Sequence, residues 1–280
     1  MDTTRKTILI TGSTDGIGLE TAKILATNGH HVLLHGRNPT KTRDVEQALA
    51  AEAGAGRIGS FVADLSSMAA VETLASDVTA RQPTLDVLIN NAGVYNAAQP
   101  RTAEGLDIRF AVNTIAPYLL TRRLAPLLGP SSRVINLSSA AQAPVDLKAL
   151  AGRVGLSDHA AYAQSKLALT MWSRVSAEAF GDDGPVCIAV NPGSLLGTKM
   201  VRTAFGMAGG DIGIGAEILR RAALDDDFAS ASGRYYDNDA RRFAPPHVDA
   251  LDARKVRDVV RTIETILADL GHALPEPASS

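Results

Sequence analysis

Hydrophobic and polar positions follow two alternating patterns along most of the chain. Short apolar or β-branched runs, typical of buried strands, are separated by longer stretches with helical spacing that open on capping residues. Seven strands are expected on this pattern, over residues 7–11, 31–36, 57–64, 85–93, 132–139, 186–193 and 232–237. Strands that alternate with helices predict a parallel sheet with helices on both of its faces.

The stretches between the strands predict the helices. They are expected over about Ile17–Thr27, from Asn38-Pro39 onward, over Ser67–Arg81, over Glu104–Leu128 with a bend at Pro117, and around Ala161–Trp172. No linker or internal repeat divides these units, so residues 1–280 are expected to form one α/β domain. Within it we expect a substrate lid over about 199–239 and a frayed tail over about 272–280.

The composition of the chain limits which classes of partner this domain can bind. The 280 residues include 28 basic and 30 acidic ones, so the net charge is −2 and no overall field attracts nucleic acid or an anionic membrane. Cys187 is the only cysteine, and no apolar run has the length of a membrane span or a secretory leader. These features favour a cytoplasmic protein whose partner is a small molecule.

A glycine-rich turn, TGSTDGIG, joins the first expected strand to the first helix. Glycine allows a sharp bend and a close approach of the backbone, and the free N–H groups at a helix start bind phosphate. The turn lacks the Gly-Lys-Ser/Thr ending of nucleoside triphosphatases. We therefore expect a dinucleotide pyrophosphate at Gly12, Ser13, Thr14, Asp15, Gly16, Ile17 and Gly18.

The end of the second strand reads HGRN, without the carboxylate that usually accepts from the adenosine ribose. Arg37 can form a fork with a 2′-phosphate and stack on adenine, which favours NADP(H). Asp15 in the glycine turn acts against this preference, so NAD(H) remains the alternative. Asp64, followed by Leu65, is expected to accept from the adenine amino group, to cap the next helix, or both.

Tyr162 and Lys166 stand out in the apolar segment AYAQSKLALTMW. Four residues apart on a helix, their side chains leave the same face. A phenol with a pKa of about 10 is a poor acid or base near neutrality, but a nearby cation lowers that pKa. Taken alone, the pair also fits a tyrosine at an interface and a lysine whose ammonium reaches water.

Four motifs then stand in one order: TGSTDGIG, NNAG at Asn90–Gly93, NLSS ending at Ser139, and YAQSK. Together they resemble the short-chain dehydrogenase/reductase family, most firmly over residues 6–193. The resemblance implies a doubly wound, Rossmann-like sheet of about seven parallel strands in three αβα layers, a nicotinamide cofactor and an Asn-Ser-Tyr-Lys active site. It also implies reversible hydride transfer with a carbonyl or secondary alcohol, without a metal.

The resemblance implies a role for each matching residue. Tyr162 is the acid/base, Lys166 lowers its pKa and bonds the nicotinamide ribose, and Ser139, with Ser138 as its rival, holds the substrate oxygen. Asn113 matches the asparagine that holds a water in the proton relay. The other matches are cofactor contacts: Asn91, Ala92 and Gly93 beside the adenine ring, and Pro192, Gly193 and Thr198 at the nicotinamide.

The chain departs from the family pattern at two places. Thr198 lies five residues after Gly193, one more than is common. Tyr162 also lies 23 residues after Ser139, more than in many members, because of the segment Ala143–His159. This longer segment resembles the retinol-dehydrogenase-like branch. We expect it to border the substrate entrance, with His159 either at the entrance or solvated at the helix start.

The sequence therefore predicts an oxidoreductase for a moderately apolar carbonyl or alcohol, since the expected lid is apolar and glycine-rich. The resemblance further implies a homodimer or homotetramer formed through the helices of Asn113 and Tyr162. A cofactor-binding regulator without turnover is the alternative, because a fold does not fix a function. A sugar-nucleotide epimerase is disfavoured, since the chain has no Gly-x-x-Gly-x-x-Gly turn.

Overall fold

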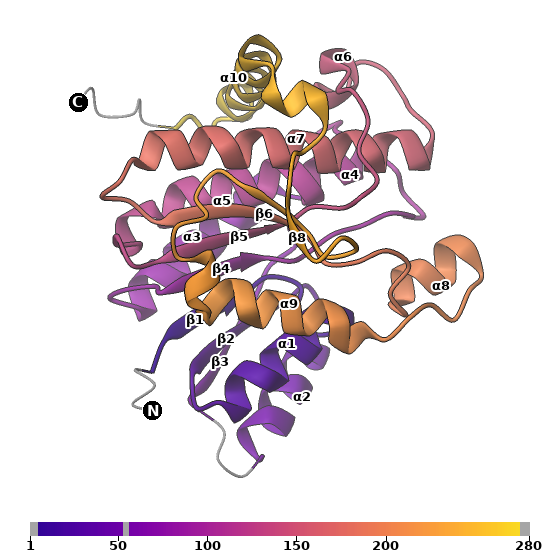
Figure 1. Cartoon of the computed structure of the whole chain (residues 1–280). Coiled ribbons are helices and arrows are strands. Elements are labelled where there is room, and N and C mark those ends of the chain that lie inside the picture. The colour runs from indigo at the N-terminus through magenta and orange to yellow at the C-terminus, as the bar shows by residue number, and fades with distance from the viewer. Residues whose placement is uncertain (1–4, 53–55, 275–280) are drawn as a thin grey trace.

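An open sheet of eight strands forms the centre of the computed structural model, which describes residues 5–52 and 56–274 (Figure 1). Its strands are β1 (Thr7–Ile10), β2 (His31–Gly36), β3 (Ile58–Val62), β4 (Val87–Asn90), β5 (Arg133–Leu137), β6 (Val186–Asn191), β7 (Tyr235–Asp237) and β8 (Arg242–Ala244). The order is β3-β2-β1-β4-β5-β6-β7-β8, and every pair is parallel except β7 with β8. The expected seven parallel strands are confirmed, and β8 adds an antiparallel edge.

Helices cover both faces of the sheet, which makes three layers (Figure 1). One face carries α1 (Gly16–Thr27), α2 (Pro39–Ala50) and α9 (Ile212–Leu224), and the other carries α3 (Met68–Arg81), α5 (Ala116–Leu124) and α7 (Asp158–Phe180), with α10 (Ala253–Asp269) outside α7. The shorter pieces are α4 (Ile108–Phe110), η1 (Ala111–Ile115), η2 (Ala125–Leu127), α6 (Leu147–Leu150), α8 (Lys199–Phe205), η3 (Asp226–Phe228) and η4 (Val248–Leu251).

Each face of the sheet has its own hydrophobic core. Alternate residues of a strand point to opposite faces, so Ile8 and Ile10 pack in one cluster with α1 and α9, whereas Leu9 packs in the other with α3, α5 and α7. All three side chains are fully buried. A sheet covered on both faces explains why these strands read as continuous apolar runs.

The helix expected over Glu104–Leu128 is shorter and interrupted. It begins at Ile108, with Asp107 as its cap, and changes to a π-helical turn at Ala111–Ile115 before α5. Residues 108–124 are helical without a break, and Pro117 directly follows the π turn, so the irregular turn lies just before the residue that has no backbone N–H to donate. The expected bend is therefore a π turn, and it contains Asn113.

The C-terminal helix α10 covers α7 and α5. The apolar run LALTMW after Lys166 is buried, and the ring of Trp172 lies 5.5 Å from that of Tyr118. The Tyr118 hydroxyl donates to Glu264 of α10 at 2.7 Å, and six apolar residues of α10 join the same core. The face through which the resemblance implied an oligomer is thus covered within the chain.

Two expected segments differ from the structure at their margins. Of the described side chains in the expected lid over 199–239, only those of Lys199, Met200, Val201 and Thr203 line the cavity described below. From Ile212 onward the chain forms α9, which packs on α1. Of the expected tail, residues 275–280 lie outside the described part, while the Ala273 carbonyl accepts from Arg123 and Leu274 packs against the core. Within the described residues, no helix has the length and apolar character needed to span a membrane.

Candidate active site

A cavity of about 1050 Å³ opens where the parallel strands end. Strand order reverses between β1 and β4, and open α/β sheets bind ligands at such a reversal. The cavity is lined by most of the residues singled out in the sequence: Gly12, Thr14, Asp15, Gly16, Ile17, Gly18, Arg37, Asp64, Leu65, Asn91, Ala92, Gly93, Ser139, Tyr162, Lys166, Pro192, Gly193 and Thr198. Ser13 and Asn113 are fully buried behind its wall.

The glycine turn between β1 and α1 leaves no room for side chains at two positions. Gly12 has a φ of +65°, and a Cβ there would lie 2.9 Å from the Ala92 Cα. A Cβ on Gly18 would lie 2.6 Å from the Gly12 carbonyl oxygen. The N–H groups of the first turn of α1 have no carbonyl partner within the helix, so those of Ile17 and Gly18 are available to an anion.

His35, at the end of β2, holds this turn in place. Its Nδ1 accepts from Gly12 N at 3.1 Å, and its Nε2 donates to the Ala63 carbonyl after β3 at 3.1 Å. Its backbone N–H also donates to the Ser13 hydroxyl. Burial lowers the pKa of His35 to about 4, so the ring stays neutral and keeps one accepting and one donating nitrogen.

Two basic side chains stand beside the turn. Arg37 is exposed at the end of β2, and Lys41, in the first turn of α2, forms an ion pair with Asp15 at 2.6 Å. Both basic residues line the cavity. The hydrogen bond from Lys41 lowers the pKa of Asp15, whose carboxylate also caps α1. The charge of Asp15, which counted against NADP(H) in the sequence, is therefore paired.

The loops after β3 and β4 complete this end of the cavity. Asp64 accepts from the Ser66 N–H and hydroxyl, while Ser67 and not Asp64 caps α3. Asn91 donates to the carbonyls of Thr11 and Gly12, at 2.8 and 3.0 Å, and so ties the β4 loop to the glycine turn.

Tyr162 and Lys166 of α7 meet Ser139 at the opposite end of the cavity. The Tyr162 hydroxyl is hydrogen-bonded to Ser139, and the Lys166 Nζ lies 5.7 Å from the centre of the Tyr162 ring. Ser138 turns away from the tyrosine, because its hydroxyl is hydrogen-bonded to Thr170 at 2.7 Å. The geometry thus brings Ser139, and not Ser138, to the tyrosine.

Burial controls the charges of this pair. It raises the pKa of Tyr162, the hydrogen bond with Ser139 opposes that rise, and Tyr95 adds to it. Burial also lowers the pKa of Lys166 to about 8, and its ammonium donates to the Leu137 carbonyl at 2.7 Å. The lowered tyrosine pKa expected from the neighbouring lysine is not found, because the ammonium faces the ring and the end of β5 rather than the hydroxyl.

Asn113 is buried behind the wall of the cavity. Its Oδ1 accepts from Val94 N at 2.8 Å, and its Nδ2 donates to the Val94 carbonyl and to the Ser165 hydroxyl, each at 3.0 Å. It is therefore more than an ordinary polar residue of a helix, because it joins the loop after β4 to α7.

Thr198 lines the cavity at the start of α8. Its hydroxyl caps that helix by accepting from Val201 N, and its methyl lies 3.6 Å from the position of a Cβ on Gly16. Leu195, in the segment between Gly193 and Thr198, adopts a φ of +53°. The threonine thus still reaches the cavity.

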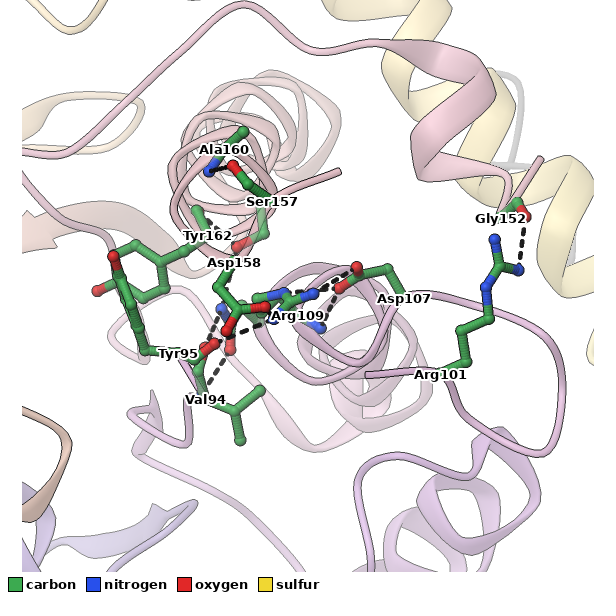
Figure 2. Close-up of polar contacts among 12 residues, drawn as sticks. Val94, Tyr95, Arg101, Asp107, Arg109, Gly152, Ser157, Asp158, Ala160 and Tyr162 are labelled. Atoms are coloured by element: carbon green, nitrogen blue, oxygen red, sulfur yellow. Dashed lines mark hydrogen bonds and ion pairs between the residues drawn. The ribbon is translucent and has the colours of Figure 1, made fainter. Parts of the chain in front are cut away.

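Several residues of the site carried no sequence motif. His35, Lys41 and Tyr95 line the cavity, and a buried arginine, Arg109, lies behind it (Figure 2). Lys41 could have been found in the sequence, because it lies four residues after Arg37 at the start of the second expected helix. The others are found only through contacts between distant segments. The insertion Ala143–His159 contributes only His159 to the cavity wall, because its helix α6 lies against α10.

Comparisons with known proteins agree with this geometry. The family model for short chain dehydrogenases matches residues 6–209. Polyprenol dehydrogenase of Homo sapiens is 37% identical over 173 residues, which are 59% of this chain and 52% of that protein, so the match spans about half of its length. Retinol dehydrogenase 13 of Homo sapiens is 27% identical over 270 residues, 87% of this chain and 80% of that protein.

Solved structures share the fold. A short chain dehydrogenase from Escherichia coli, complexed with NADPH, has a TM-score of 0.67 and 27% sequence identity to this chain. The similarity covers 83% of this chain and 96% of that one.

Proposed function

Because this chain belongs to the short chain dehydrogenase family, we propose that it is an NADP(H)-dependent oxidoreductase in which Tyr162 is the acid/base for a carbonyl or secondary alcohol. One observation carries the proposal. Tyr162, Ser139 and Lys166 converge at one end of a cavity whose other end is a glycine turn at the start of α1.

The cavity fits a dinucleotide. A Cβ at Gly12 would meet the Ala92 backbone, and a Cβ at Gly18 would meet Asn91 and the Gly12 carbonyl, so the turn needs glycine at both positions. Its N–H groups would bind a pyrophosphate. From there the cavity runs past Asn91–Gly93 to Lys166, Pro192, Gly193 and Thr198, which would hold the nicotinamide riboside. When bound, the cofactor supplies or accepts the hydride.

The chain's own residues handle the proton. In reduction, Tyr162 gives its hydroxyl proton to the carbonyl oxygen, and Ser139 donates to the same oxygen and holds it near the tyrosine. Burial keeps Tyr162 protonated, which suits a proton donor. Lys166, held by the Leu137 carbonyl, would bond the nicotinamide ribose and so position the cofactor beside Tyr162. In oxidation the same proton moves in reverse.

NADP(H) is the proposed cofactor because the two basic side chains of the cavity at the end of β2 would bind a 2′-phosphate: Arg37, which is exposed, and Lys41, which also pairs with Asp15. The NADPH complex of the Escherichia coli relative supports this choice. NAD(H) remains the alternative.

The proposed substrate is a moderately apolar alcohol or carbonyl compound. Val94, Val112, Leu195 and Met200 give this end of the cavity an apolar wall, and the names of two relatives refer to polyprenol and retinol. A cytoplasmic location and a homodimer or homotetramer stay predictions.

The test is a fluorescence titration with NADPH and NADH, followed by a panel of apolar alcohols and carbonyl compounds read at the nicotinamide absorbance. We expect NADPH to bind at least about tenfold more tightly than NADH, a difference of ~1.4 kcal/mol, and at least one compound to be turned over. Binding without turnover across the panel would favour the regulator. Binding of neither cofactor would contradict the proposal.

A further inference from the structure

We propose that Arg109 is a positioning residue that fixes the wall formed by Tyr95 and His159 beside Tyr162, an inference that rests on the proposed function. The three segments concerned are far apart in the sequence. Tyr95 follows β4, Arg109 lies in α4 and His159 stands in the first turn of α7. Tyr95 and His159 line the cavity beside Tyr162. Figure 2 shows Arg109 next to Tyr95 and Asp158.

Arg109 is only 1% exposed, yet it carries a full charge. Its Nε and Nη2 form a fork with Asp107, at 2.9 and 2.7 Å. Its Nη1 donates to Asp158 at 2.6 Å and to the Tyr95 carbonyl at 3.2 Å. Burial opposes the charge, but the bonds to Asp107 and Asp158 outweigh it and raise the pKa of Arg109.

The contacts of Arg109 run parallel to those of Asn113, four residues further on. Asn113 holds Val94 from both sides and reaches α7 through Ser165, while Arg109 holds the next residue, Tyr95, and reaches α7 through Asp158. Consecutive residues of the β4 loop are thus fastened to α7 by two side chains of one short helical segment. Asn113 was expected from the resemblance, and Arg109 was not.

Tyr95 connects this anchor to the chemistry. Its ring lies 4.9 Å from that of Tyr162, and its hydroxyl is hydrogen-bonded to His159 Nδ1 at 3.2 Å. His159 directly follows Asp158, the residue that Arg109 binds. Arg109 therefore holds both members of the Tyr95–His159 pair: it binds the Tyr95 carbonyl and the side chain of Asp158, the residue before His159. The pair forms the side of the cavity next to Tyr162.

A buried ion pair is a weak source of stability, because the loss of hydration offsets most of the attraction. Well-packed apolar residues in place of the whole ion pair would stabilise the fold about equally well, whereas removal of Arg109 alone leaves the Asp107 carboxylate unpaired. A guanidinium that joins three segments at fixed angles instead specifies where those segments lie, which is the property that an active-site wall requires.

The experiment compares Arg109→Met and Arg109→Lys with Arg123→Met as a matched control. Arg123 also forms a fork, with Glu72 at 2.7 to 3.0 Å, but it joins α5 to α3 away from the cavity. For Arg109→Met we expect kcat/KM to fall about 10²-fold while the Kd of NADPH changes less than about twofold, because a displaced wall misplaces the substrate and not the cofactor. Arg109→Lys keeps the charge but not the fork, and should recover about tenfold of this loss.

Hydrogen exchange supplies a readout that does not depend on turnover. The amides of residues 94–96 and of the first turn of α7 should exchange at least tenfold faster in Arg109→Met, and should be unchanged in Arg123→Met. A folded Arg109→Met protein with kcat/KM within threefold of the parent, or with a loss equal to that of Arg123→Met, would overturn the proposal.

Asp158→Ala, which removes the oxygen that accepts from Arg109 Nη1, decides the matter if Arg109→Met does not fold. Asp158 is 51% exposed, and its loss leaves the Arg109–Asp107 fork in place, so the protein should fold and lose about tenfold in kcat/KM. A change below twofold, with unaltered exchange, would overturn the proposal. If the parent protein shows no turnover at all, the proposed function fails. Hydrogen exchange of residues 94–96 and of the first turn of α7 still tests whether Arg109 holds Tyr95 and His159 in place.

Discussion

The two ends of the cavity are built in different ways. At the cofactor end the wall is made of strand ends and the glycine turn, and hydrogen bonds through His35 and Asn91 join β1, β2, β3 and β4. At the substrate end the wall is made of loops together with α7 and the short helix α8, and one of its side chains, Leu195, is 46% exposed. The first end is fixed by the sheet, whereas the second depends on a few long-range anchors.

The lid shows how such an end is organised. Its base is tied by backbone bonds, since Gly197 N donates to the Gly210 carbonyl at 2.7 Å and Gly210 N donates to the Leu195 carbonyl at 2.8 Å. Beyond this base, α8 and the following loop project away from the sheet (Figure 1). A cofactor common to a family can therefore be bound by a fixed frame, while the substrate is selected by segments that vary without disturbing the sheet.

The largest expected effect concerns the chemical step. Tyr162→Phe should lower kcat by about 10²–10⁴-fold, because the proton donor is lost, and should leave the Kd of NADPH nearly unchanged. Steady-state rates and a fluorescence titration measure the two quantities. If the variant kept most of its turnover, Tyr162 would not be the acid/base. The distinction between a cofactor end and a chemical end of the cavity would then fail.

The next effect tests how firmly the cofactor end is built. The pKa of His35 is about 4 in the folded protein against 6.5 for an ordinary histidine. Below pH 6.5 the unfolded chain therefore binds more protons than the folded one, and the unfolding free energy decreases as the pH is lowered. Between pH 7 and pH 5 this histidine should cost about 2 kcal/mol of unfolding free energy. Urea unfolding at both pH values measures it.

His35→Gln is the matched control for that measurement. Burial also lowers the pKa of His30 and His31, and both residues remain in the variant, so their share of the pH dependence cancels in the comparison. The variant should therefore lose about 2 kcal/mol less than the parent between pH 7 and pH 5. Equal losses would mean that His35 is not the neutral support of the glycine turn.

A smaller effect concerns cofactor choice. Lys41→Met should raise the Kd of NADPH about tenfold, ~1.4 kcal/mol, and should leave the Kd of NADH unchanged, because only NADPH carries the 2′-phosphate. Arg43→Met is the control, since Arg43 belongs to the same helix and does not line the cavity. An equal loss of affinity for both cofactors would mean that Lys41 acts by pairing with Asp15 in the glycine turn and does not bind the 2′-phosphate.

The smallest effect is expected at the lid. Leu195→Gly removes an apolar contact, and it also removes a side chain from a left-handed backbone position, which costs about 1 kcal/mol or more for a non-glycine residue. The KM of an apolar substrate should rise about threefold, ~0.7 kcal/mol, while the unfolding free energy does not fall. A lower stability would show that Leu195 supports the fold rather than the substrate.

The fold was readable from the sequence because its signals are local. The apolar runs at Thr7–Ile10 and His31–Gly36 are buried on both sides and predict strands without knowledge of the neighbours. The helix over Glu104–Leu128 was not readable in detail, because whether Pro117 bends a helix or follows a π turn depends on what packs around it. The eighth strand, β8, has only three residues and gives no periodic signal.

The candidate site was readable where residues belong to one motif. The glycine turn and the pair Tyr162 and Lys166 are each set by a short spacing, so their placement in one cavity could be foreseen once the strand order was assumed. The choice between Ser138 and Ser139 could not, since it depends on which hydroxyl meets Thr170. The raised pKa of Tyr162 likewise depends on burial that no spacing reveals.

The sequence by itself determined the alternation of strand and helix, the glycine turn and the four motifs that mark the family, because each is a property of neighbouring residues. Only the tertiary structure decided that α10 covers α7, that Lys41 pairs with Asp15, and that Arg109 fastens Tyr95 to the start of α7. These contacts join residues 26 or more positions apart in most cases. Such pairs form only when the sheet has brought the segments together, and so their energies are not encoded in any local pattern.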